Sequence, residues 1–385
     1  MHTQGITHKK LIVLTSYATI GMLGLYMALY QYTILNVAQM FFVDAVMMGI
    51  MIGMQHLGMS IPPLLFGILS RKFGKKTIIV MSYALLILGT FIAGASQNLT
   101  VFVISVFIIG AGYSVIEATL SAVLSDEFPE NSTRHMNFTQ IAFSTGALAG
   151  PFLTAALINK GIFFKDLYMY CSVVFLLLGI VFLFTKCRNS KEDSGESLVS
   201  HLGIFFRSRV FLLLACGIFL YVGIENTIAS FCDSYFVLHL GSPDVSAYAL
   251  ALYWGALIPS RLLAGIIKLN VKKMFISISM IVFSSIIFGM MISDSTAKVI
   301  AFAFMGFGCG PIWPLLMDTA AKNNRGATGS ALNIMFAFSA IGGASVPLIS
   351  SFFVSAVNQT SAYYLSATIA LIMLGVYLLS VKKRK

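Results

Sequence analysis

Long apolar blocks, separated by short polar stretches, run through the whole chain. An α-helix of about 20 apolar residues crosses about 30 Å of hydrocarbon, the thickness of a bilayer core. The apolarity within each block is continuous and does not alternate, which indicates helices and not the strands of a membrane barrel. Only 10% of the residues are charged, against about 25% in soluble domains. We therefore expect an all-α integral membrane protein with twelve transmembrane helices, at about 11–34, 45–69, 77–96, 100–124, 136–158, 167–186, 209–235, 247–267, 273–292, 298–319, 328–353 and 361–381.

The net charge of +11 is distributed unevenly along these spans. If the amino terminus lies inside, 21 Lys and Arg residues fall inside and only Lys160, Lys165 and Lys298 fall outside. The positive-inside rule uses such an excess to assign orientation. We therefore expect a multi-pass protein of the cell (plasma) membrane with both termini in the cytoplasm. The basic residues then serve topology and contact membrane lipid, and we expect no nucleic-acid partner.

Sequence motifs for other classes of function are absent. The stretch "GKKT" (74–77) lacks the glycine five residues earlier that a phosphate-binding loop needs, and neither HExxH nor GxSxG occurs. The five cysteines have no paired spacing, so we expect neither a disulfide framework nor a metal site. We expect no cofactor and no enzymatic activity.

The longest polar stretch, "KCRNSKEDSGES" (186–197), divides the spans into six and six. Its mixed charge, serines and glycine are typical of a flexible linker. We therefore expect an N-terminal six-helix bundle at 1–186, a cytoplasmic linker at 187–208 and a C-terminal six-helix bundle at 209–385.

The two halves also resemble each other in sequence. The stretch "IPPLLFGILSRKFGKK" (61–76) aligns with "IPSRLLAGIIKLNVKK" (258–273) at a shift of 197, and two further alignments agree within one residue. This agreement indicates a duplication, and parallel repeats of six spans are a transporter architecture.

One loop resembles a signature of a known family. "GILSRKFGKK" (67–76) is similar to the loop between spans two and three of the major facilitator superfamily, with Ser70 in place of the usual Asp. "YVGIE" (221–225), "YWGALIPSRLLAG" (253–265) and "GFGCGPIWP" (306–314) resemble the sugar–proton symporter branch, which includes fucose permeases. The resemblance implies two pseudo-symmetric six-helix bundles that rock around a central cavity. It also implies gating residues, which we place at Gly67, Arg71, Gly74, Lys75 and Arg261.

Glu225 is the most unusual residue, because it lies within an apolar block. An ionised acid in mid-bilayer costs about 3 kcal/mol on insertion scales. The carboxyl group can face an aqueous cavity or carry a proton, and both suit a proton-coupled carrier. Tyr221 lies four residues earlier on the same helix face, and Asn226 adjoins it. The alternative is a protonated structural acid that is hydrogen-bonded to a neighbouring helix.

Glu117 repeats this arrangement in the other half, with Tyr113 four residues earlier. The family resemblance implies a proton-coupling role for Glu117, and an interhelical or snorkelling acid is the alternative. Asp318 is expected at the membrane interface, close to Lys322. His56 could change its protonation near physiological pH, or be a packed polar group.

Trp313 lies between Pro311 and Pro314, which should kink or unwind its span. Its indole could stack on a sugar ring, or be a core aromatic. Gly146 and its equivalent Gly342, with Gly150 and Gly343, are expected in close helix packing. The candidate substrate-binding residues are Tyr30, Gln31, Tyr113, Asn137, Gln140, Tyr221, Asn226, Trp254, Trp313 and Asn333.

These features favour a monomeric secondary active transporter. Our first hypothesis is proton-coupled symport of a small polar solute, a sugar or polyol, by alternating access, with Glu225 and Glu117 as proton-coupling residues. The alternative is a proton-coupled antiporter that exports drugs or metabolites from a cavity lined by Met and Phe. An intramembrane enzyme or a sensor lacks support from any motif.

Overall fold

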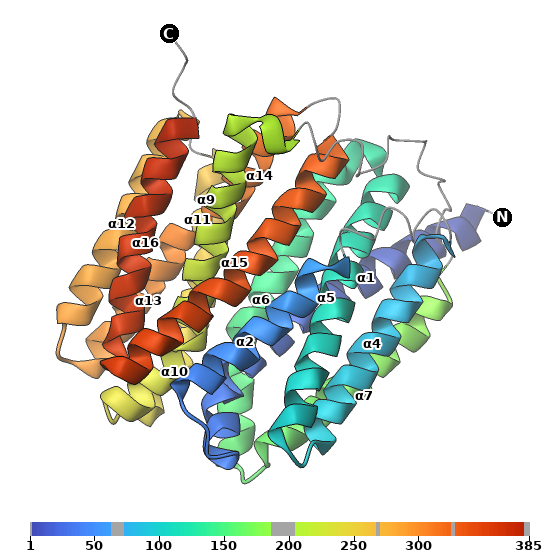
Figure 1. Ribbon diagram of the computed structural model, residues 1–385. Coiled ribbons are helices and arrows are strands. Elements are labelled where there is room, and N and C mark those ends of the chain that lie inside the picture. Colours follow the sequence, from blue (N-terminus) through green and yellow to red (C-terminus); the bar gives the residue numbers. More distant parts are fainter. Residues whose placement is uncertain (1, 63–72, 186–204, 267–269, 325–327, 381–385) are drawn as a thin grey trace. The chain divides into compact units, whose positions relative to one another are not determined.

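The computed structural model describes residues 2–62, 73–185, 205–266, 270–324 and 328–380 (Figure 1). Within these ranges the chain is built from helices and connecting turns, and no strand occurs. The all-α prediction is therefore confirmed.

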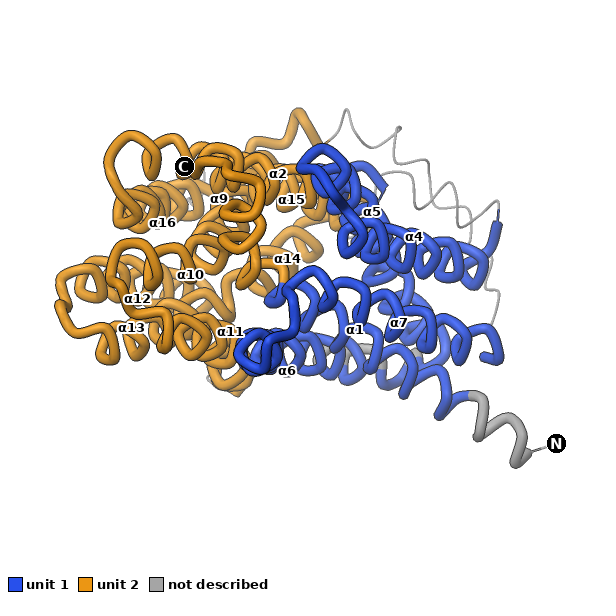
Figure 2. The backbone as a smooth tube through the Cα atoms, turned by 90° about the horizontal axis from the view of Figure 1, so that it is seen from below, with its two compact units in different colours: residues 1–29, 57–195 blue, residues 30–56, 196–385 orange. Residues whose placement is uncertain are grey.

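The chain divides into two compact units (Figure 2). The first unit holds residues 1–29 and 57–195, and the second holds 30–56 and 196–385. The bundle boundaries predicted at 186 and 209 stay a prediction.

The helices of the first unit follow the predicted blocks. They are α1 (His2–Met40) up to residue 29, α4 (Lys75–Ala95), α5 (Leu99–Glu127), the short 3-10 helix η1 (Pro129–Asn131), α6 (Ser132–Asn159) and α7 (Phe164–Leu183).

The second unit contains the remaining helices. They are α1 from residue 30, α2 (Ala45–Ser60) up to residue 56, α9 (Arg209–Ser230), α10 (Cys232–Ser234), the π-helix η2 (Tyr235–His239), α11 (Pro243–Ile266), α12 (Val271–Met291), α13 (Ser295–Cys309), α14 (Ile312–Asn323), α15 (Thr328–Ala356) and α16 (Thr360–Ser380).

Eleven helical segments in the described ranges are long and apolar enough to cross a membrane. They correspond to eleven of the twelve predicted spans. The remaining prediction, 45–69, coincides with the shorter apolar helix α2, and its last part lies in 63–72, outside the described residues. The predicted span 209–235 ends earlier, because α9 stops at Ser230 and α10 and η2 follow.

Side-chain caps fix several helix starts. Asn98 accepts from the Val101 amide at 2.9 Å at the start of α5, and Asp294 accepts from the Ala297 amide at 2.7 Å at the start of α13. These bonds satisfy amide groups that have no partner inside the helix. The short polar stretches between spans therefore end one helix and begin the next.

Corresponding helices pack in the same way within each unit. In the first unit α4 packs against α5 and α7, and in the second α12 packs against α13 and α16 (Figure 1). A Cβ atom on Gly146 of α6 would overlap the Gly21 carbonyl of α1, and one on Gly342 of α15 would overlap the Phe219 carbonyl of α9. Gly146 and Gly342 are 196 positions apart, so the predicted repeat has a structural counterpart at the same contact.

The other predicted packing glycines behave similarly. Gly150 lies against the Leu25 carbonyl of α1, and Gly343 lies against the His56 ring of α2. The predicted role of these glycines in close helix packing is confirmed.

The predicted break near Trp313 is also confirmed. Helix α13 ends at Cys309 and α14 begins at Ile312, so Gly310 and Pro311 interrupt the span. Proline lacks the amide hydrogen that would continue the helix.

Candidate functional site

Two pairs of consecutive residues organise the candidate site in the second unit. Glu225 and Asn226 lie on α9, and Tyr253 and Trp254 lie on α11. Consecutive side chains on a helix point about 100° apart. As a result, one member of each pair contributes to a carboxylate network and the other to an amide network.

The carboxylate network surrounds Glu225. The Tyr221 hydroxyl donates to Glu225 Oε1 at 2.5 Å, as the spacing of four residues predicts. The Tyr253 hydroxyl donates to the main-chain oxygen of Glu225 at 3.2 Å. Both tyrosines are fully buried, whereas Glu225 is partly exposed. The Tyr221–Glu225 distance of 2.5 Å is at the short end for a hydrogen bond between two oxygen atoms.

Arg261 supplies a positive charge near this carboxylate. It lies on α11 and is close enough to act electrostatically on Glu225. Its Nε donates to the carbonyl of Gly310 at 3.1 Å, where the chain breaks between α13 and α14. Arg261 therefore links the acid to the interrupted helix, and its predicted gating role stays a prediction.

The amide network joins three buried side chains. The Trp254 indole donates to Gln31 Oε1 at 2.9 Å, and Gln31 Nε2 donates to Asn226 Oδ1 at 3.4 Å. Asn226 Nδ2 then donates to the Val222 carbonyl at 2.9 Å. Gln31, Asn226 and Trp254 were predicted separately, and the structure brings them together. Their role in substrate binding stays a prediction.

His56 lies beside the amide network. Its Nδ1 is 3.0 Å from the Ile52 carbonyl, which can only accept, so Nδ1 carries the proton. The ring lies within interaction range of Asn226 and packs on Gly343. The structure therefore favours the interpretation of His56 as a packed polar group.

Three further predicted binding residues lie in the second unit. Trp313 packs edge-on against Phe336 of α15, with ring centroids 5.3 Å apart, which favours the core-aromatic alternative. Asn333 is half-buried on α15, and Tyr30 is buried beside Gln31. The binding roles of all three stay predictions.

The candidates of the first unit lie on α5 and α6. Tyr113 is buried, and Glu117 and Gln140 are half-buried. Asn137 falls in α6, and its side chain lies outside the described residues. The coupling role of Glu117 and the binding roles of the others stay predictions.

The family-like loop is described only at its end. Gly67 and Arg71 lie outside the described residues. Gly74 has a φ of 79° immediately before α4, a conformation that favours glycine. Lys75 is almost fully buried and forms an ion pair of 2.7 Å with Asp126 at the end of α5. The sequence analysis missed Asp126.

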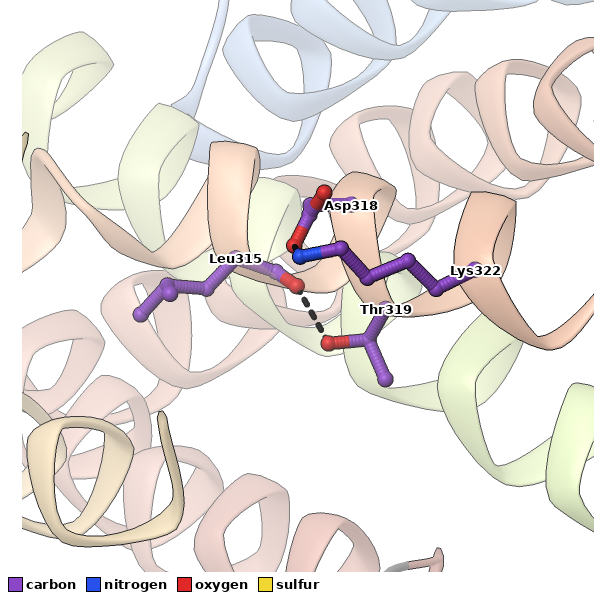
Figure 3. A network of polar contacts seen from close by, with 4 residues as sticks. All are labelled: Leu315, Asp318, Thr319 and Lys322. Carbon is purple, nitrogen blue, oxygen red and sulfur yellow. Dashed lines mark hydrogen bonds and ion pairs between the residues drawn. The ribbon is translucent and has the colours of Figure 1, made fainter. Parts of the chain in front are cut away.

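Asp318 forms a surface pair, as predicted. Its carboxylate lies 2.6 Å from the Lys322 ammonium, and both side chains are at least half exposed (Figure 3). In the same helix, α14, the Thr319 hydroxyl donates to the Leu315 carbonyl at 2.6 Å (Figure 3). Asp318 is therefore an interfacial residue and not a member of the buried networks.

Asp233 is a buried acid that the sequence analysis did not single out. It lies in α10, beyond the membrane-spanning segment Arg209–Ser230, and is 5% exposed. Burial raises its pKa to about 6, and a hydrogen bond with the Ser246 side chain partly opposes this rise. Tyr32 also hydrogen-bonds with Ser246. An acid inside the apolar run "SFCDSYF" (230–236) was the available signal.

Comparisons with known proteins agree with this architecture. The sequence profile of the Major Facilitator Superfamily matches residues 11–268 and 214–385. A protein named glucose/galactose transporter from Brucella abortus is 23% identical over 319 residues, covering 77% of this chain and 76% of its own. A putative glucose/galactose transporter from Helicobacter pylori is 25% identical over 314 residues, covering 74% of each.

Two solved structures share the fold. The nucleoside transporter NupG superposes with a TM-score of 0.79 at 11% identity, covering 97% of this chain and 100% of its own. The Escherichia coli fucose:proton symporter FucP superposes with a TM-score of 0.68 at 19% identity, covering 98% and 99%. With a family profile that matches nearly the whole sequence, the chain belongs to the major facilitator superfamily of membrane transporters.

Proposed function

We propose that this protein is a secondary active transporter that moves a sugar or polyol together with protons, by alternating access. It acts as a monomer in the plasma membrane, with both termini in the cytoplasm. The names of the relatives from Brucella abortus and Helicobacter pylori support a sugar as the solute. The name of the structural neighbour FucP supports proton symport.

The single observation that carries the proposal is the adjacency of the two networks. An acid suited to a proton and a set of amide and indole groups suited to hydroxyls meet at Glu225–Asn226 and again at Tyr253–Trp254. The rings of Tyr253 and Trp254 also pack edge-to-face at 5.6 Å. Each of the two helices therefore contributes neighbouring residues to both networks.

Glu225 is the proposed proton carrier. In its ionised form, the Tyr221 hydroxyl and the nearby Arg261 charge stabilise the carboxylate. A proton on Glu225 removes the attraction to Arg261, which also holds the Gly310 carbonyl at the helix break. The proton thus changes the relative stability of the two conformations, because a ligand shifts an equilibrium by its differential affinity for the two states. Glu117 is proposed as a second coupling acid in the first unit.

The test is sugar accumulation in proteoliposomes under an imposed inward proton gradient, with labelled glucose, galactose and fucose. We expect Glu225→Gln to abolish accumulation above equilibrium while sugar exchange across the membrane continues, because the amide cannot release a proton. Asp318→Asn, which removes an exposed acid, is the matched control and should accumulate sugar normally.

Two outcomes would count against the proposal. Full gradient-driven accumulation by Glu225→Gln would exclude this residue from coupling. Efflux of solute driven by an inward proton gradient would instead favour the antiporter alternative.

A further inference from the structure

An open groove with a volume of about 440 Å³ lies along α1, α6 and α7 in the first unit. Small residues such as Gly21 of α1 and Ala142 of α6 leave this space between the helices unfilled. Among the described residues that line it, Thr145 has the only hydroxyl, and that hydroxyl already donates to the Ile141 carbonyl at 2.8 Å. The groove therefore suits an apolar occupant.

The groove opens onto an exposed apolar surface. Ala18, Ala149 and Val174 line it and are themselves exposed. Val174 lies on α7 beside Val173 and Leu177, which are also exposed. Helix α7 is long and apolar enough to cross a membrane, and the hydrocarbon core holds no water. Acyl chains of the bilayer therefore have direct access to the groove.

A cation lies in line with the groove on α1. Lys10, Leu14 and Gly21 follow one another at spacings of four and seven residues, so they share one face of the helix. Lys10 is exposed, and Leu14 is 68% exposed. Lys9, one position earlier, instead holds its ammonium 5.5 Å from the centre of the Phe128 ring. The groove thus continues through an exposed leucine to the Lys10 ammonium.

Helix α6 repeats this spacing. Arg134, Phe138 and Thr145 again lie four and seven residues apart, and the Arg134 guanidinium is 5.5 Å from the centre of the Phe138 ring. The two helices touch at this end, because the Tyr17 hydroxyl of α1 is 2.6 Å from Nδ1 of His135 of α6. Two exposed cations, one from each wall, therefore lie at the same end of the groove.

The length and position of this arrangement match half of a bilayer. Residues 138–149 of α6 rise about 16 Å along the helix axis, and one leaflet contributes about 15 Å of hydrocarbon. The positive-inside rule assigns the end with Lys10 and Arg134 to the cytoplasm. The cytoplasmic leaflet is also the one that carries anionic lipids.

From these observations we infer that the groove is a binding site for one anionic phospholipid of the inner leaflet. Its phosphate headgroup lies at Lys10 and Arg134, and one acyl chain occupies the groove. A sugar does not fit, because the groove offers a polar solute no free hydrogen-bonding group. The site lies in the first unit, whereas both networks around Glu225 and Asn226 lie in the second. The inference is therefore independent of which solute the protein transports.

The test is native mass spectrometry of the purified protein in detergent, titrated with phosphatidylglycerol or phosphatidylcholine that carry the same two acyl chains. We expect one phosphatidylglycerol to bind in preference to phosphatidylcholine. The double variant Lys10→Gln/Arg134→Gln should bind it about 25-fold more weakly, because each basic residue near an anionic surface contributes about fivefold in affinity. Arg209→Gln/Lys272→Gln, which removes two exposed cations of the second unit, is the matched control and should bind like wild type.

A second variant tests the place of the acyl chain. Ala149→Phe fills the groove with a side chain, and we expect it to lose the bound phosphatidylglycerol. Ala156→Phe is the control, because this exposed residue lies seven positions further along α6, beyond the groove. If Ala149→Phe does not fold, phosphatidylglycerol with two six-carbon chains provides the same test on wild type. It should bind more weakly than the long-chain lipid, and glycerol phosphate should not compete at all.

Four outcomes would overturn the inference. The first is equal binding of phosphatidylglycerol by the Lys10→Gln/Arg134→Gln variant and its control. The second is equal affinity of wild type for the two headgroups. The third is full competition by glycerol phosphate, which would leave a phosphate patch without a lipid site. The fourth is a wild-type dimer that Ala149→Phe abolishes, which would assign the groove to a second copy of the chain.

Discussion

Glu225 and Asp233, two acids in apolar stretches of the second unit, lie in different surroundings. Glu225 accepts from a tyrosine hydroxyl and has Arg261 nearby. Asp233, in the short helix α10 just after α9, interacts with Ser246 and Tyr32, which are neutral groups. An acid that is buried without a compensating cation is costly to ionise. Asp233 should therefore affect stability, whereas Glu225 is better suited to function.

Replacement of Asp233 by Asn should change the pH dependence of stability. The pKa of Asp233 rises from 3.8 to about 6 on folding, so the folded protein holds this proton more tightly than the unfolded chain. Stability therefore falls as pH rises from about 4 to about 6, and the full penalty of about 3 kcal/mol persists above pH 6. We expect Asp233→Asn to melt at a higher temperature than wild type at pH 7.5 and to lose this advantage at pH 4.

The measurement is thermal unfolding of purified protein in detergent across this pH range. Asp244→Asn, which alters an exposed acid in the first turn of α11, is the control and should follow the wild-type curve. A wild-type protein that becomes more stable between pH 4 and 6 relative to Asp233→Asn would contradict the argument.

Individual residues of the site could be predicted from sequence, but their grouping could not. Glu225, Asn226 and Trp254 stood out because polar or indole groups are unusual in apolar spans. Their division into two networks depends on how α9 and α11 face each other and α1. The bond from Tyr253 to the Glu225 main chain has no sequence signal for the same reason. The contact of Trp313 with Phe336 could not be predicted, because a position between two prolines says nothing about a residue on another helix.

At the scale of helices, pairs of spans meet where glycine removes the side chain. Without a strong hydrophobic force between helices in lipid, association depends on close packing. Gly146 on α6 and Gly342 on α15 both lie directly against a carbonyl of the first helix of their own half. The repeat in the sequence thus preserves a contact, and not only a hydropathy pattern.

A large side chain at either glycine should disrupt the packing between its helix and the first helix of the same half. Gly146→Leu and Gly342→Leu would force a side chain into a backbone carbonyl, and overpacking costs about 1–3 kcal/mol or more. We expect both variants to melt at a clearly lower temperature than wild type. The measurement is the fraction of monodisperse protein that remains in size-exclusion chromatography after heating. Gly375→Leu is the control, because nothing lies within 4 Å of that position on α16. Melting of all three variants at one temperature would show that the contacts do not stabilise the pairs.

Among the described residues, the structure contains a buried ion pair between two helices and an exposed ion pair within a single helix. The Lys75–Asp126 pair joins α4 to α5 with the ammonium buried, whereas Asp318–Lys322 lies within one exposed helix. Removal of one partner of a buried pair leaves an uncompensated charge, whereas exposed pairs contribute less than about 1 kcal/mol. The family-like loop therefore has a structural role at Lys75 in addition to its expected gating role.

At the scale of the whole molecule, length and hydropathy predicted the spans well. Eleven helical segments matched because continuous apolarity of about 20 residues has few other solutions in a membrane. The ends of the helices were harder to predict. The predicted span 209–235 ran too long, because η2 continues apolar sequence in a π-helical turn after α9 has ended. Hydropathy measures composition, and it does not register where a helix changes its hydrogen-bond pattern.

Orientation is the remaining property of the whole molecule that the sequence predicts, through the excess of 21 inner over 3 outer basic residues. Two asparagines test it, because Asn159 ends α6 on the predicted outer side and Asn323 ends α14 on the predicted inner side. Both are exposed. In a variant without the five native cysteines, Asn159→Cys should react with a membrane-impermeant maleimide in intact cells. Asn323→Cys should react only after permeabilisation. The opposite pattern would mean that the amino terminus lies outside, and the inward proton gradient of the proposed symport would then have to act from the other side.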